Sequence, residues 1–125
     1  MDVNIYASWM AFLLGSVTGA GLGLFFHKSD WLGGYNSWRR RLMRLGHISF
    51  FGLGLLNLGF GLTAQHFGIS SGLTLASSLL LIGLFTMPTV CYLAAYRTGF
   101  RHLFFIPAGS VVIALALVAW RLVQL

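Results

Sequence analysis

Residues 5–26, IYASWMAFLLGSVTGAGLGLFF, contain no charged side chain. An α-helix needs about 20 mostly apolar residues to cross the hydrocarbon core of a bilayer, so this run is long enough to span a membrane. Three more runs share its character, at residues 47–64, 69–95 and 103–119. The sequence therefore predicts an all-α integral membrane protein, a four-helix bundle that forms a single domain over residues 1–125.

The composition excludes the main alternatives to a membrane protein. Only 8% of the 125 residues are charged and 58% are hydrophobic, whereas a soluble domain carries about 25% charged residues. So few charged side chains cannot cover a folded surface in water. Disordered chains are poor in apolar residues, so disorder is excluded as well.

The basic residues indicate how the bundle is oriented. Four spans place both termini on one side of the membrane, and that side carries only Arg121. The opposite side carries Lys28, Arg39, Arg40, Arg41, Arg44, Arg97 and Arg101. The positive-inside rule then predicts cytoplasmic arginines and extracytoplasmic termini, in a plasma or inner membrane. The net charge of +6 is explained by membrane lipids as partners, without nucleic acid.

The long connection, residues 27–46, combines aromatic and turn-forming residues with an arginine cluster. Ser37 is a good N-cap, so we expect a helix to start there and to run into the second span. Cations in a first helical turn oppose the helix dipole, which calls for an anionic partner. Phospholipid headgroups, a partner's carboxylates or a cofactor's propionates would serve. The candidate lipid or anion contacts are Arg39, Arg40, Arg41 and Arg44.

Small residues mark the expected packing faces. The first span carries one every four positions, at Ala7, Ala11, Gly15, Gly19 and Gly23. Small residues let helices approach closely in lipid, so this ridge predicts either a face for a partner or second copy, or packing within the bundle. On the second span Gly54, Asn57 and Gly61 share one face. Asn57 needs a hydrogen-bond partner, either another helix or a bound headgroup or quinone.

Three histidines, His27, His47 and His102, are expected near the same interface. Two neutral imidazoles can ligate a haem iron, and histidines can also contact a quinone headgroup. His47 is the best single candidate because it leads the small-residue face of the second span. The alternative is that these side chains only touch lipid headgroups, and the sequence leaves the cofactor unknown.

Catalytic chemistry has little support in the sequence. The only acids, Asp2 and Asp30, lie outside the apolar runs, and Glu is absent. This excludes the carboxylate relays typical of proton-coupled transport. Motifs for phosphate binding, metal ligation or a nucleophile elbow are also missing. We therefore expect neither a catalytic residue nor a metal site.

The leading functional interpretation is a small non-catalytic membrane subunit. It would pack into a larger complex, or against itself, through glycine-lined helix faces and an arginine-rich cytoplasmic loop. The first alternative is a redox anchor that binds haem b or quinone through His47 with His27 or His102. The second alternative is a small transporter or channel with the Ser- and Thr-rich third span lining its path.

Overall fold

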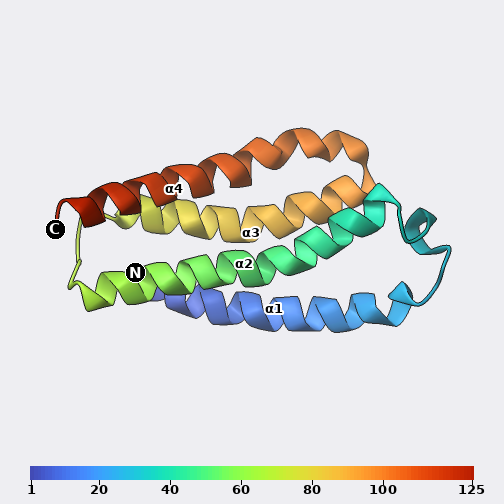
Figure 1. Ribbon diagram of the computed structural model, residues 1–125, viewed down its shortest axis with the longest axis horizontal. Coiled ribbons are helices and arrows are strands. Elements are labelled where there is room, and N and C mark those ends of the chain that lie inside the picture. The colour runs from blue at the N-terminus through green and yellow to red at the C-terminus, as the bar shows by residue number, and fades with distance from the viewer.

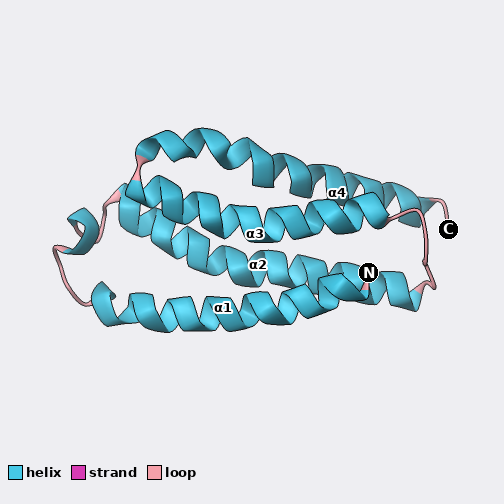
Figure 2. Cartoon of the chain, turned by 180° about the vertical axis from the view of Figure 1, so that it is seen from behind, coloured by secondary structure: helices cyan, strands magenta, loops and turns pink.

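The computed structural model describes residues 1–125 and consists of helices joined by loops (Figure 2). The elements are α1 (Asp2–Phe26), η1 (Trp31–Gly33), α2 (Trp38–His66), α3 (Thr74–Tyr96), η2 (Thr98–Phe104) and α4 (Phe105–Val123), with η marking 3-10 helices. By length and composition, α1, α2, α3 and the segment Thr98–Val123 could each cross a membrane. The predicted all-helical bundle with four such helices is confirmed.

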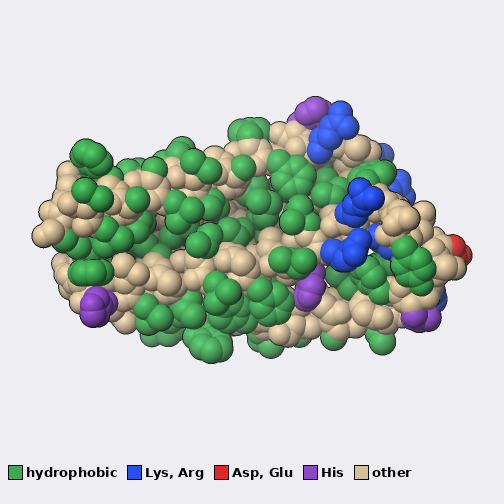
Figure 3. All heavy atoms as spheres, in the orientation of Figure 1, with side chains coloured by type: hydrophobic (Ala, Val, Ile, Leu, Met, Phe, Trp, Pro, Cys, Tyr) green, Lys and Arg blue, Asp and Glu red, His purple; other side chains and the backbone are tan.

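Both chain termini lie at the same end of the bundle (Figure 1). We call this the terminal end; it also holds the connection between α2 and α3. The opposite end holds the connections from α1 to α2 and from α3 to α4. It carries every Lys and Arg except Arg121, and we call it the arginine end. Figure 3 shows these cations gathered at one end, with hydrophobic side chains along most of the visible length.

The helix boundaries follow local signals. Ser37 caps α2, because its hydroxyl accepts a hydrogen bond from the Arg40 backbone N–H at 3.3 Å. The helix then continues without a break to His66. Gly68 and Gly72 adopt positive φ angles of 62° and 85°, a conformation that costs glycine little. This turn delays α3 until Thr74, beyond the expected start at residue 69.

The helices pack in chain order. α2 lies between α1 and α3, and α4 packs along α3 without an extensive contact with α1 or α2. One buried cluster joins α2, α3 and α4 toward the terminal end through Phe60, Ile69, Leu73, Ala76, Leu80 and Ala114. A second cluster joins α1, α2 and α3 through Ala11, Phe50, Leu53 and Leu84. The outer faces of α1 and α4 therefore have no partner helix within the chain.

The small-residue ridge of α1 packs against α2 of the same chain. A Cβ added at Gly15 would lie 2.8 Å from Phe51 Cε2, and one at Gly19 would collide with His47. Ala11 is buried in the same contact and Ala7 packs beside it. A Cβ added at Gly23, by contrast, would meet no atom within 4 Å. Of the two expected roles for the ridge, the structure shows packing within the bundle.

The glycines of α2 serve the same contact from the other side. A Cβ added at Gly54 would lie 2.6 Å from Phe12 Cε1, and one at Gly61 would lie 2.5 Å from Ile5 Cγ1. Larger residues at these positions would push α1 away from α2. The two helices therefore approach closely because each presents glycine to a large side chain of the other.

Candidate functional site

A buried polar cluster joins α1, α2 and α3 near the terminal end. The Asn4 Nδ2 group donates to Asn57 Oδ1 at 2.8 Å and to the Ser77 carbonyl at 3.2 Å. The Asn57 Nδ2 group donates to the carbonyls of Leu53 and Leu80 at 2.9 and 3.2 Å. The Ser77 hydroxyl in turn donates to Asn4 Oδ1. We call Asn4, Asn57 and Ser77 the asparagine clasp.

The clasp satisfies its own hydrogen bonds. Asn4 and Asn57 are fully buried, and each of their side-chain amides has partners within the chain. The expected partner of Asn57 is therefore another helix. Sequence reasoning missed Asn4 because it began the first span at residue 5. As an amide immediately before that start, Asn4 was the available signal.

A second buried polar group, Arg40, holds the loop at the arginine end. Its guanidinium is fully buried and donates to the main-chain carbonyls of Trp31, at 2.7 Å, and Lys28. The guanidinium carbon lies 4.4 Å from the Tyr35 ring centroid and 5.4 Å from that of Phe26. Such contacts with aromatic faces stabilise a desolvated cation. We call this arrangement the Arg40 cage.

Further contacts close the loop around Arg40. The Tyr35 hydroxyl donates to the His27 carbonyl at 2.9 Å, and the Ser37 hydroxyl donates to the Leu32 carbonyl at 2.6 Å. Leu32 has a φ of 54°, in the left-handed region that branched side chains rarely adopt. The loop between α1 and α2 thus has a defined structure held by its own hydrogen bonds.

The structure separates the arginines that the sequence grouped together. Arg39, Arg41 and Arg44 are exposed on α2, as are Arg97 and Arg101 beyond α3. Arg40 is buried, so its charge serves the loop and does not face outward. The physical reason is that its long side chain turns back to the loop, where it donates to the main-chain carbonyls of Trp31 and Lys28 and contacts aromatic rings.

The three candidate histidines lie on separate surfaces. His47 fills the notch at Gly19 and stacks edge-on against Phe51, with centroids 5.4 Å apart. Gly19 is eight residues before His27, about 12 Å along α1 by helix rise, and His27 is exposed. His102 belongs to η2 and lines a cavity formed by η2 and its neighbour Arg97. No group of three or more His, Cys, Asp or Glu residues could hold a metal ion.

The small space beside His47 is occupied by the protein itself. The imidazole takes the room that Gly19 leaves, so the small-residue face does not keep an open pocket there. Its Nδ1 atom is buried and has no hydrogen-bond partner.

The Thr hydroxyls of the third span, which the transporter interpretation places along a path, bond within their own helix. Thr86 and Thr89 donate at 2.6 Å to the carbonyls of Ile82 and Phe85 on α3.

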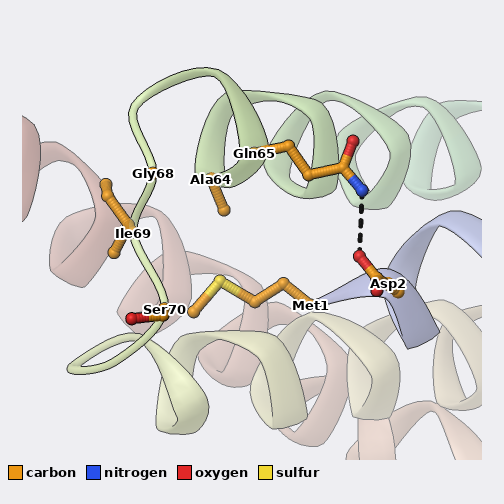
Figure 4. A pocket seen from close by; sticks show the side chains of 7 residues that line it. All are labelled: Met1, Asp2, Ala64, Gln65, Gly68, Ile69 and Ser70. Atoms are coloured by element: carbon orange, nitrogen blue, oxygen red, sulfur yellow. Dashed lines mark hydrogen bonds between the residues drawn. The ribbon is translucent and has the colours of Figure 1, made fainter.

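A cavity of about 400 Å³ opens at the terminal end (Figure 4). It lies between the start of α1 and the turn that follows α2. Its only acid, Asp2, accepts a hydrogen bond from Gln65 Nε2 at 2.9 Å. The Met1 side chain extends across it toward Ser70 (Figure 4). The cavity offers a ligand little beyond main-chain groups and an already bonded carboxylate.

Two adjoining cavities at the arginine end form the best candidate site. One, of about 440 Å³, is lined by Leu32, Arg39, Met43, Tyr92, Ala95, Tyr96 and Arg97. The other, of about 430 Å³, is lined by Thr18, Gly21, Leu22, Phe25, Trp31, Met43 and Tyr92. They share Met43 and Tyr92, and we call the pair the arginine-end crevice. Arg39 and Arg97 therefore line one side of a largely apolar space.

No family model, no curated protein and no solved structure matches this chain.

Proposed function

We propose that this chain is a small non-catalytic integral membrane subunit that packs into a larger membrane complex. Its arginine end would lie among the headgroups of the cytoplasmic leaflet. One observation carries the proposal. The outer faces of α1 and α4 have no partner helix, while every Lys and Arg except Arg121 lies at one end. Such a chain has apolar helix faces for docking and almost no surface for soluble partners.

The glycines that remain open support docking on a further face. Gly52 and Gly59, seven residues apart on α2, have nothing within 4 Å of an added Cβ. Exposed Leu55 and Leu62 follow these glycines by three residues each, on the same face of α2. Small residues at such spacing let a second helix approach closely in lipid. This face is available to a partner, whereas Gly54 and Gly61 are used by α1.

Purification in mild detergent followed by native mass spectrometry tests the proposal. We expect a complex of fixed stoichiometry with other membrane subunits. Changing both Gly52→Ile and Gly59→Ile should release those subunits, because the added side chains would block close approach. The matched control is Ile48→Leu, which keeps an exposed apolar residue of equal size on α2. A chain that remains a monodisperse monomer and co-purifies with no subunit would contradict the proposal.

A redox anchor is the second candidate, and the unpartnered Nδ1 of His47 favours it. A quinone carbonyl could accept a hydrogen bond from that nitrogen once the imidazole turned out of the notch at Gly19 that it fills. The test is the visible spectrum and the extracted quinone of the purified protein. A haem absorption band, or quinone that is lost on changing His47→Ala, would support this function. A colourless protein with unchanged quinone content in both forms would rule it out.

A further inference from the structure

The arginine-end crevice combines charge, depth and an unpartnered donor in one place. Arg39 and Arg97 both line its outer cavity and both are exposed. The only acid at this end is Asp30, which does not line either cavity. Two neighbouring guanidinium groups without an internal counterion favour an anion with several oxygen acceptors, such as a phosphate group.

The crevice becomes apolar away from its arginines. Met43 is four residues beyond Arg39 on α2, and Tyr92 is five residues before Arg97, so both lie about 6 to 7.5 Å deeper along their helices. The second cavity lies beside them toward α1, where Leu22, Phe25 and other largely apolar residues line it. A soluble anion would leave this apolar part unfilled. An amphiphile with an anionic head would fill both parts.

A polar donor lies at the boundary between the two parts. The Tyr92 hydroxyl is buried and makes no hydrogen bond within the chain. Thr18 lines the same cavity, but its hydroxyl donates to the Leu14 carbonyl at 2.7 Å. Leaving the Tyr92 hydroxyl unpaired costs free energy, because it has lost its bonds to water. In a glycerophospholipid the ester carbonyls follow directly after the phosphate. They would therefore meet Tyr92 when the phosphate meets the arginines.

We propose that the arginine-end crevice binds one anionic phospholipid. Its phosphate pairs with Arg39 and Arg97, an ester carbonyl accepts a hydrogen bond from Tyr92, and the first methylenes pack on Met43 and Leu22. The Arg40 cage holds the loop residues Trp31 and Leu32 as the wall of the site. This rests on the part of the proposed function that places the arginine end among headgroups, and it needs no partner subunit.

Native mass spectrometry of the full, delipidated chain in detergent tests the site. The probes are dioleoyl-phosphatidylglycerol and dioleoyl-phosphatidylcholine, which share acyl chains and differ in net charge. We expect one tightly bound phosphatidylglycerol per chain and much weaker binding of phosphatidylcholine. An excess of inorganic phosphate should not displace the lipid, because it cannot fill the apolar part. Equal binding of the two lipids, or full displacement by phosphate, would overturn the proposal.

Two matched double variants locate the charge contribution. A cation near a headgroup contributes roughly fivefold in affinity, so R39Q with R97Q should weaken phosphatidylglycerol binding about 25-fold. The control, R41Q with R44Q, removes the same charge from exposed positions of α2 outside the crevice. It should weaken binding less than about threefold by the loss of long-range attraction alone. Equal weakening by both pairs would show diffuse attraction and overturn the site.

A neutral variant keeps the test valid if an arginine variant fails to fold. Met43→Trp fills the space shared by both cavities without changing charge, and it should abolish binding of the single lipid. Circular dichroism and gel filtration check that the helices and the monodispersity are retained. A folded Met43→Trp chain that still binds the lipid at wild-type affinity would contradict the proposal. We expect a chain that has lost the lipid to co-purify with the same subunits. A failure of the lipid site and a failure of the proposed function are therefore distinguishable.

Discussion

The Asn57 amide has no contact with solvent, and its partners come from three helices. Replacing it by leucine, Asn57→Leu, removes one partner of Asn4 and leaves buried polar groups unpaired. We expect the free energy of unfolding to fall by about 2 kcal/mol, within the range for such groups. Unfolding in mixed detergent micelles with increasing dodecyl sulfate, followed by circular dichroism, measures this. The control Ser78→Ala, next to Ser77 but exposed, should change stability by less than about 0.5 kcal/mol.

A double-mutant cycle isolates the contact between the two amides. If Asn4 and Asn57 stabilise each other directly, Asn4→Leu and Asn57→Leu together should cost less than the sum of the two. The expected coupling is about 1 kcal/mol, inside the range measured for polar contacts between membrane helices. Strict additivity would show that the hydrogen bond between them contributes nothing to stability.

The buried charge of Arg40 makes a separate prediction about the loop. Arg40→Leu removes the guanidinium hydrogen bonds to the carbonyls of Lys28 and Trp31, which we expect to cost about 2 kcal/mol of local stability. Because proteolysis follows the population of the open loop, trypsin should cut after Lys28 about 30-fold faster. The exposed neighbour gives the control, Arg41→Leu, with little change expected. Unchanged cleavage in Arg40→Leu would show that the cage does not hold the loop.

At the scale of a helix pair, α3 and α4 meet at Gly83. A Cβ added there would collide with Val111 Cγ2, and the branched valine has little rotamer freedom with which to move aside. Gly83→Ala should therefore destabilise the protein by about 1 to 3 kcal/mol. Gly59→Ala meets open space and should be neutral or stabilising, because alanine has the higher helix propensity. The same unfolding assay compares them, and equal effects would argue against this packing.

The sequence predicts elements that depend on local properties. The apolar runs locate four helices because spanning length is a property of each run alone. Ser37 marks the start of α2 because capping involves neighbours only. The turn at Gly68 and Gly72 requires positive φ angles, and glycine marks that need directly.

Features that depend on distant residues are harder to predict. Asn4 and Asn57 are 53 residues apart, and the local sequence around each does not identify the other as its hydrogen-bond partner. The burial of Arg40 depends on the fold of the loop around it, with Leu32 in an unusual backbone conformation. The packing order is also non-local. It leaves α4 packed on α3, without an extensive contact with α1 or α2.

At the scale of the whole molecule, two ends differ in charge while the length between them is apolar. The arginine end carries the exposed cations, the crevice and the folded loop, and the terminal end carries both termini (Figures 1 and 3). A bilayer would match this pattern, because its core excludes charge and its cytoplasmic surface attracts cations. The proposed function depends on the two ends facing opposite sides of a membrane.

Cysteine labelling in intact cells tests that dependence. In a Cys91→Ser background, single changes Asn36→Cys and Gln124→Cys place exposed thiols at the arginine end and the terminal end. A membrane-impermeant maleimide added outside should label Gln124→Cys at once and should label Asn36→Cys only after the membrane is opened. Labelling of both thiols from outside, or of Asn36→Cys alone, would contradict the account.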